Sequence, residues 1–206
     1  MILSIATIQK TALTLATVGM VAAAATASTG RSLEAKTVAP ADLWLKKAAT
    51  VKHKQLFDFP TSGGGVPLVH IMNYYDTWNK AYGVADKDIN ALGTFYGATT
   101  FFGVSDAMWA KYKIGEFLNE KDAAGQAFTR NPWREEPVIL GMNLRQASIE
   151  SLQKRGTSFI ICNNALTIFS GILAKARGLD ATEVYNDLKA NILPGVELIP
   201  GMVVAI

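Results

Sequence analysis

Residues 157–178 join a short apolar strand to an amphipathic helix, and this unit constrains the fold more than any other part of the chain. Thr157 to Cys162 is an apolar run of strand length, and apolar residues then recur at helical spacing until Gly178. A second apolar strand is predicted from Ile89 to Tyr96, and the chain closes with a strand from Val196 to Ile206. Strands that alternate with helices in this way predict an α/β fold, in which a mostly parallel central sheet carries helices on both faces in three layers.

Further elements are predicted from local patterns. Pro67 to Met72 is apolar except for His70, and near-continuous apolar strands are typical of a parallel sheet covered on both sides, so we predict a first strand there. A helix from Tyr74 to Tyr82 is expected after it. Ser105 is expected to cap a helix that runs to Leu118. A short third strand is predicted from Val138 to Gly141.

The composition divides the chain into three parts. Residues 1–27 are predicted to be a signal peptide, because Lys10 is the only charged residue before Arg31 and Ala25-Thr26-Ala27 offers a small-x-small cleavage site. Residues 28–65 are expected to form an N-terminal lead-in and loop. Residues 66–206 are expected to form one α/β domain with a single core.

The leader determines where we expect the protein to work. A cleaved leader predicts a soluble protein that is periplasmic or secreted. The alternative is an uncleaved membrane anchor formed by residues 11–30, because this uncharged run reaches the length of about 20 residues that a spanning helix needs. A membrane contact is therefore expected only if the leader stays attached.

A glycine run, Gly63 to Gly65, ends the lead-in. Such a run can cradle phosphate when it joins a strand to a helix. Here it precedes the predicted strand at Pro67 and has no Lys-Ser/Thr partner, so we expect a plain loop.

Charge and residue usage exclude several classes of function. The net charge is only +3, and the Lys and Arg residues are scattered, so no nucleic-acid partner is expected. The single cysteine excludes an internal disulfide framework. Two distant histidines and one cysteine lack the spacing of metal ligands, which predicts no metal. Neither a dinucleotide-binding fingerprint nor a Gly-x-Ser-x-Gly motif is present, and no cofactor is expected.

Cys162 is the best candidate for a reactive residue. It ends an apolar strand and a helix is predicted to follow at once, and α/β proteins tend to keep their sites at the carboxyl ends of strands. A helix N-terminus favours the thiolate, which is the nucleophilic form. Asn163 and Asn164, with the free amides of the helix, could then bind an anion or a persulfide. The alternative is that Cys162 is a small buried apolar residue.

Other polar residues follow the predicted strands. In a parallel sheet His70, Asn73 and Tyr96 would lie on the same rim as Cys162, where they could line a small-ligand pocket. His70 could then tune the thiol. The alternatives are a satisfied core histidine and ordinary loop capping.

The segment from Leu152 to Leu166, which contains Cys162, resembles the cysteine segment of DsrE/DsrF-like proteins. The closing segment from Leu193 to Ile206 is similar to the final strand of that family, and the region with His70 and Asn73 is a weaker match. Together these segments span most of residues 66–206.

The resemblance implies a compact α/β domain with a mostly parallel sheet, often assembled into oligomers. Some members of the family carry sulfur as a cysteine persulfide, and Cys162 is the only residue here that matches a functional position. The resemblance is greatest to an exported bacterial branch, whereas the known sulfur relays are cytoplasmic and lack the long insert from Tyr96 to Trp133. The expected partners are a small sulfur-containing ligand or a thiol, and further copies or subunits of a complex.

A second function stays open from the sequence. In this alternative the protein is a non-catalytic ligand-binding or accessory subunit, and the Cys162 side chain only packs in the core. An aromatic rim would then be the contact surface, formed by Tyr74, Tyr96, Trp109 and Trp133. Whether the protein is an enzyme is left undecided by the residues, since no nucleophile–base pair can be assigned.

Overall fold

The computed structural model describes residues 43–135 and 137–204. The helices and strands of this part, in chain order, are α1 (Leu43–Thr50), β1 (His53–Phe57), α2 (Val66–Tyr82), β2 (Ile89–Phe95), α3 (Asp106–Tyr112), α4 (Ile114–Leu118), β3 (Val138–Ile139), β4 (Met142–Asn143), α5 (Ile149–Arg155), β5 (Ser158–Cys162), α6 (Asn163–Arg177), α7 (Ala181–Ala190) and β6 (Val196–Ile199). Short 3-10 turns connect them: η2 (Gly63–Gly65), η3 (Asp86–Asp88), η4 (Gly97–Gly103), η5 (Arg145–Ala147) and η6 (Met202–Val204).

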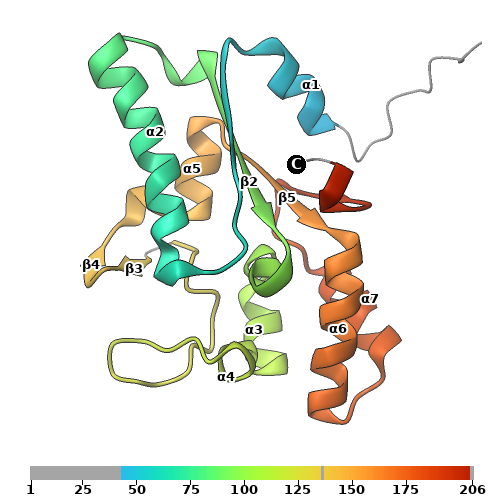
Figure 1. The fold of residues 1–206 in the computed structure, drawn as a ribbon. Coiled ribbons are helices and arrows are strands. Elements are labelled where there is room, and N and C mark those ends of the chain that lie inside the picture. Colours follow the sequence, from blue (N-terminus) through green and yellow to red (C-terminus); the bar gives the residue numbers. More distant parts are fainter. Residues whose placement is uncertain (1–42, 136, 205–206) are drawn as a thin grey trace, which may run out of the picture. The chain divides into compact units, whose positions relative to one another are not determined.

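The central sheet confirms the predicted α/β class. It has four parallel strands in the order β1-β2-β5-β6, so the order in space follows the order in the chain (Figure 1). Connections between parallel strands are nearly always right-handed, and a sheet that grows in one direction therefore collects its connecting helices on one face. Helices α2 and α5, which precede β2 and β5, do share one face.

That face carries the main core, and we call it the thick face. Phe159 and Ile161 of β5 point into it, together with Leu68 and Tyr75 of α2, and all four are fully buried. The same core continues past the carboxyl ends of the strands, where η4 packs against α6.

The opposite face, here called the thin face, has a much smaller cover. Alternate side chains of β2 and β5, such as Leu92 and Ile160, point to it. They are covered by Trp44 of α1 and Met202 of η6. Helices therefore lie on both faces, as predicted, but the two layers differ greatly in thickness.

The strand predicted from Pro67 to Met72 is wrong, because this segment is the start of α2. Leu68, Ile71 and Tyr75 are its buried residues, and their spacing is helical. Pro67 lies in the first turn of the helix. Proline is favoured there because the N–H groups of the first turn have no partner within the helix, so the N–H that proline lacks is not missed. A short apolar run has the same periodicity in a buried strand and in a helix, which explains the error.

The first strand of the sheet is instead β1, within the segment expected to be a lead-in. It pairs with β2 from His53↔Ile89 to Phe57↔Gly93 and forms one edge of the sheet. Lys54 and Gln55 are exposed. Because an edge strand does not need an apolar sequence, the usual strand pattern is missing here.

Other differences are local. The expected third strand at residues 138–141 forms a separate antiparallel hairpin of β3 and β4 and does not enter the central sheet. The expected helix from Ser105 to Leu118 is divided into α3 and α4 by Lys113, which has a left-handed φ of 51°. The last strand ends at Ile199.

Helix ends follow clear local sequence signals. Gly83, Gly156 and Gly178 each end a helix in the left-handed conformation. Asp180 begins α7, and its Oδ1 accepts hydrogen bonds from the N–H groups of Thr182 and Glu183, each at 2.9 Å.

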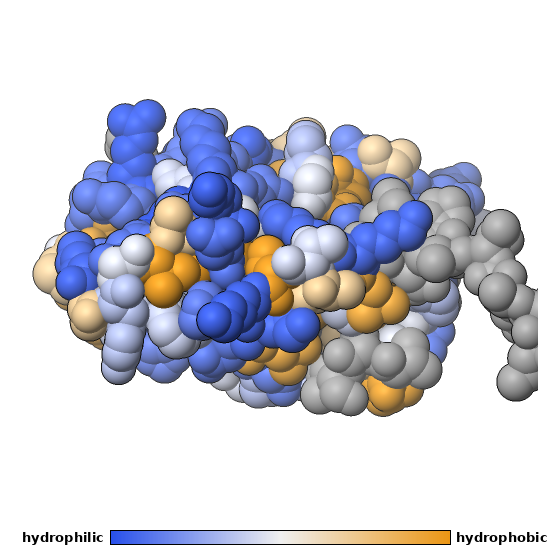
Figure 2. Space-filling view, turned by 90° about the horizontal axis from the view of Figure 1, so that it is seen from above, coloured by the Kyte–Doolittle hydropathy of each residue, from blue (hydrophilic) through white to orange (hydrophobic). Residues whose placement is uncertain are grey.

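Figure 2 looks onto the end of the molecule where the strands begin, and its hydrophobic side chains are separate spots among hydrophilic ones. Among the described residues, no helix combines the length and the apolar composition needed to cross a membrane. The predicted leader, residues 1–27, and the alternative anchor at residues 11–30 lie outside the described residues.

Candidate functional site

Cys162 is the last residue of β5 and the N-cap of α6, as the sequence predicted. It pairs with Ile199 of β6 at the carboxyl end of the sheet. Its side chain belongs to the thin-face cluster of Trp44, Ile160, Ile199 and Met202, and only 5% of the residue is exposed. The thiol therefore lies at the expected edge of the sheet, under the thinner of the two layers.

Two backbone N–H groups converge on the sulfur. The N–H of Ala165, in the first turn of α6, donates to Sγ at 3.4 Å, and the N–H of Met202 in η6 donates at 3.3 Å. The two donor residues, Ala165 and Met202, are 37 positions apart in the chain. Fixed N–H dipoles and a helix N-terminus stabilise negative charge, so this arrangement can hold a charged sulfur.

The two asparagines after Cys162 face different surroundings. The side-chain oxygen of Asn163 accepts a hydrogen bond from the Tyr185 hydroxyl at 2.7 Å, which ties α6 to α7. Asn164 is exposed, and its Nδ2 lies 3.1 Å from where a Cβ on Gly201 would stand. Asn164 thus lies beside the turn that supplies the second N–H donor, whereas Asn163 has a structural partner.

Tyr96 is the one predicted rim residue that reaches the same cluster. It is partly buried against the thin-face residues, and its hydroxyl donates to Oδ2 of Asp58 at 2.8 Å. Burial, with the neighbouring Asp58 carboxylate, raises the pKa of Tyr96. Asp58 was missed from the sequence because it follows β1, a strand that the pattern did not predict.

His70 and Asn73 do not belong to this site. Both lie on α2 and are exposed, while α2 packs on the thick face through Leu68, Ile71 and Tyr75. Since Cys162 is buried on the other face, His70 cannot tune the thiol as expected. The physical cause is the misassigned strand: in a helix, residues 70 and 73 point away from the buried side.

The aromatic rim expected for an accessory role is only partly a surface. Trp109 is fully buried, and its Nε1–H donates to the carbonyl oxygen of Phe101 at 2.8 Å. Trp133 is 2% exposed. These two residues cover the core, whereas Tyr74 and Tyr96 are half-buried.

The glycine run joins β1 to α2 through η2, and does not precede a strand as expected. A carboxylate lies there, because the Ser62 hydroxyl donates to Oε1 of Glu120. The N–H groups of Gly65 and Val66 already donate to carbonyl oxygens of the same turn, and Pro67 has none. Negative charge and few free donors make this turn unsuited to phosphate.

Within residues 43–135 and 137–204, no group of three or more His, Cys, Asp or Glu side chains is placed so that it could hold a metal ion. The chain matches no family model, and neither the curated proteins nor the solved structures contain a significant match to it.

Proposed function

We propose that this protein binds or relays sulfane sulfur through Cys162. The observation that carries the proposal is the convergence of two N–H donors, from Ala165 and Met202, on one sulfur at the end of a parallel strand. A persulfide, like a thiolate, is anionic, and fixed N–H groups favour an anion at this position. The resemblance of the cysteine segment to DsrE/DsrF-like proteins supports the same chemistry.

The transfer step needs no cofactor. The Cys162 thiolate attacks the outer sulfur of a donor persulfide, R–S–SH. A Cys162–S–S bond forms, the S–S bond of the donor breaks, and the donor leaves as the thiolate R–S⁻. Release follows the same route in reverse, when an acceptor thiolate attacks the outer sulfur and Cys162 leaves as the thiolate.

Burial adds a condition to this chemistry. Only 5% of Cys162 is exposed; it is buried in the cluster that also contains Trp44 and Met202, and the N–H of Met202 bonds its sulfur. Attack on a donor requires the sulfur atoms to meet, so the cover must move before transfer. We therefore expect loading to be limited by opening of the thin face.

The test is intact-mass spectrometry after incubation with glutathione persulfide. Wild-type protein is expected to gain about 32 Da per sulfur atom, and reductant should remove the gain. Cys162→Ser keeps an N-cap residue of the preferred type, so it should fold and remain unloaded. Trp44→Ala is expected to load faster. If neither wild type nor Trp44→Ala gains mass under conditions where the donor loads a free thiol peptide, the proposal is wrong.

The deep burial of Cys162 also favours the second function, a non-catalytic ligand-binding or accessory subunit of a larger complex. In that case the thiol serves as the N-cap of α6 and as packing. It would then react with an alkylating reagent only at the rate of global unfolding, and Cys162→Ser would leave complex formation intact.

Export remains part of the proposal. Intact mass of protein from the envelope fraction tests it: loss of residues 1–27 indicates a cleaved leader and a periplasmic or secreted protein. A full-length mass in the membrane fraction would instead favour an anchor at residues 11–30. Size-exclusion chromatography with light scattering reports whether the mature protein is a homo-oligomer.

A further inference from the structure

A cavity lies away from Cys162, mainly in the part of the chain that the sequence marked as an insert, residues 96–133. Its volume is about 530 Å³, within the range of small-molecule pockets. Its apolar lining comes from three places: Phe128 on the loop after α4, Pro132 and Trp133 at the end of the insert, and Val138 and Ile139 of β3. Apolar walls of this kind suit a ligand with an apolar body.

The wall opposite the loop is fixed by close packing. Gly64 of η2 lines the cavity, and a Cβ added at the next residue, Gly65, would lie 2.8 Å from Cγ1 of Ile139. The turn and the hairpin thus approach each other as closely as glycine permits. Ile139 is 1% exposed, so this wall is part of the core.

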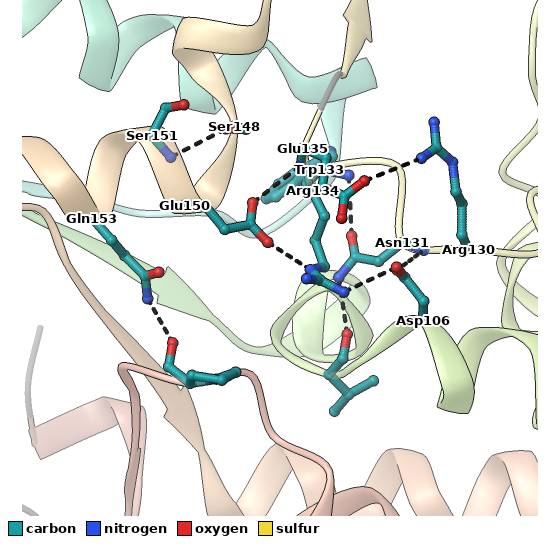
Figure 3. A network of polar contacts seen from close by, with 12 residues as sticks. Asp106, Arg130, Asn131, Trp133, Arg134, Glu135, Ser148, Glu150, Ser151 and Gln153 are labelled. Atoms are coloured by element: carbon teal, nitrogen blue, oxygen red, sulfur yellow. Dashed lines mark hydrogen bonds and ion pairs between the residues drawn. The ribbon is translucent and has the colours of Figure 1, made fainter.

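A polar network holds the remaining wall in place (Figure 3). Asn131 donates through Nδ2 to the carbonyl oxygens of Phe102 at 2.7 Å and Val104 at 3.0 Å. Next to Trp133, the guanidinium of Arg134 bonds Oδ2 of Asp106 on α3 at 2.9 Å and Oε1 of Glu150 on α5 at 2.6 Å. The segment with Pro132 and Trp133 is therefore fixed before any ligand arrives, which lowers the entropic cost of binding.

The charges at the cavity favour a cation. Two carboxylates and one ammonium line it, from Glu120, Asp122 and Lys121. Glu120 is half-buried, and among the described residues its carboxylate accepts a hydrogen bond only at Oε1, from Ser62. Asp122 uses Oδ1 to accept the N–H groups of Ala124 and Gln126 at 2.9 Å. The half-buried charge that faces a ligand is thus negative.

We propose that this cavity binds a small organic cation, with its apolar body against Phe128, Pro132 and Trp133 and its ammonium group at Glu120. An ammonium can form a charge-assisted hydrogen bond with a carboxylate whose second oxygen is still available. The site is separate from the proposed sulfur chemistry, so either can fail alone.

Three probes with the same aromatic body and different charges test the proposal: 2-phenylethylamine, 2-phenylethanol and 3-phenylpropionate. Binding to the full chain is followed by NMR shifts of assigned backbone amides. We expect 2-phenylethylamine to bind tightest, with shifts in residues 120–128 and 138–141. Glu120→Gln keeps the acceptor for Ser62 but removes the charge, and should weaken amine binding about tenfold with little effect on the alcohol. Glu116 is an exposed carboxylate on α4 outside the cavity. The control variant Glu116→Gln should therefore leave the affinity for all three probes unchanged.

Ala124→Trp provides an independent check, because Ala124 lines the mouth of the cavity and is exposed. The larger side chain should block all three probes, while sulfur loading at Cys162 stays unchanged. Amine binding no tighter than that of the alcohol or the acid, an amine affinity unaffected by Glu120→Gln, or no binding of any probe at millimolar concentration would each overturn the proposal.

Discussion

The two faces of the central sheet have been built in different ways from the same strands. Within β5, Phe159 and Ile161 point into the thick face, while Ile160 and Cys162 point into the thin one. The thick face is closed by the helices that connect the strands. The thin face is closed by elements from either end of the described chain, α1 and η6, and α1 has only eight residues.

This difference follows from topology. When strand order follows chain order, right-handed connections place the connecting helices on one face and leave the other to the chain ends. A short helix has little stability alone and depends on docking. We therefore expect the cover of the candidate thiol to open at a lower cost in free energy than the thick face, as transfer at its sulfur requires.

The largest expected contrast compares two neighbours in β5. Ile160 and Ile161 are both fully buried, on the thin and the thick face respectively. Ile161→Ala should lower the free energy of unfolding by about 4 kcal/mol and Ile160→Ala by about 2 kcal/mol, because a thin cover can settle into the space left behind. Urea denaturation measures both. Equal losses would show that the two faces are equally rigid.

Glycine positions sharpen the comparison with smaller effects. A Cβ at Gly93 of β2 would lie 2.6 Å from the ring of Phe159, in the thick face. Gly93→Ala should therefore destabilise the protein by about 1–3 kcal/mol through overpacking. Apart from the nearby backbone of α6 itself, no described residue has an atom within 4 Å of a Cβ added at Gly171. Gly171→Ala should stabilise by about 0.5–1 kcal/mol, since glycine is unfavourable inside a helix. Thermal denaturation of both variants gives the signs, and destabilisation by Gly171→Ala would contradict the packing described.

Trp44 tests whether the thin cover opens alone. Its backbone N–H donates to Oε2 of Glu197 at 3.2 Å, but its buried Nε1 has no hydrogen-bond partner among the described residues. Leaving a buried donor unpaired costs about 1–3 kcal/mol, which weakens the docking of α1. Trp44→Ala should speed alkylation of native Cys162 by N-ethylmaleimide about tenfold, with a smaller loss of global stability than Ile161→Ala.

Trp44→Phe is the matched control, because it keeps an aromatic cover and removes the unpaired N–H. In Trp44→Phe, the alkylation rate of Cys162 should be close to that of wild type and no higher than that of Trp44→Ala. If Trp44→Ala alkylates at the wild-type rate while Ile161→Ala speeds the reaction, Cys162 is reached only by global unfolding, and the thin face is not a separate opening unit.

The sequence predicted the carboxyl-terminal part of the fold well and the amino-terminal part poorly. From Gly156 to Ile199, Gly156 and Gly178 end two helices and Asp180 begins a third, so local chemistry and tertiary structure agree. Before Gly83 the signals conflict. An apolar helix start at Pro67 resembles a strand, and the edge strand at His53 resembles a loop, because its neighbours lie far away in the chain.

For the site, the sequence located the thiol but not its surroundings. Cys162 was predicted from its place between a strand and a helix. The second N–H donor is a backbone group of Met202, and no side-chain pattern can reveal a backbone contact that depends on how η6 folds back. His70 was assigned to the site only because its helix was taken for a strand. The cavity around Trp133 was missed since its walls are a loop, a turn and a hairpin.

The smallest expected effect concerns charges that tie α5 to α2 on the thick face. Asp76 accepts from Lys80 at 2.9 Å and from Arg155 at 2.6 Å. The hydrogen bond from Lys80, with that from Arg155, holds the pKa of Asp76 below its usual range. A carboxyl with a lowered folded-state pKa adds stability above its unfolded pKa, near about 4, and this stability is lost as the pH falls through the folded value.

Asp76→Asn should therefore destabilise the protein by about 1 kcal/mol or less near neutral pH, since the partly exposed pair is screened by solvent. The difference from wild type should disappear as the pH is lowered below about 4. Urea denaturation midpoints of Asp76→Asn and wild type, measured across this pH range, test the prediction. Asp88→Asn is the control, because Asp88 is an exposed carboxylate outside the Arg155 contacts. A difference that persists in acid would show that Asp76 stabilises the contact between α2 and α5 through packing and not through its charge.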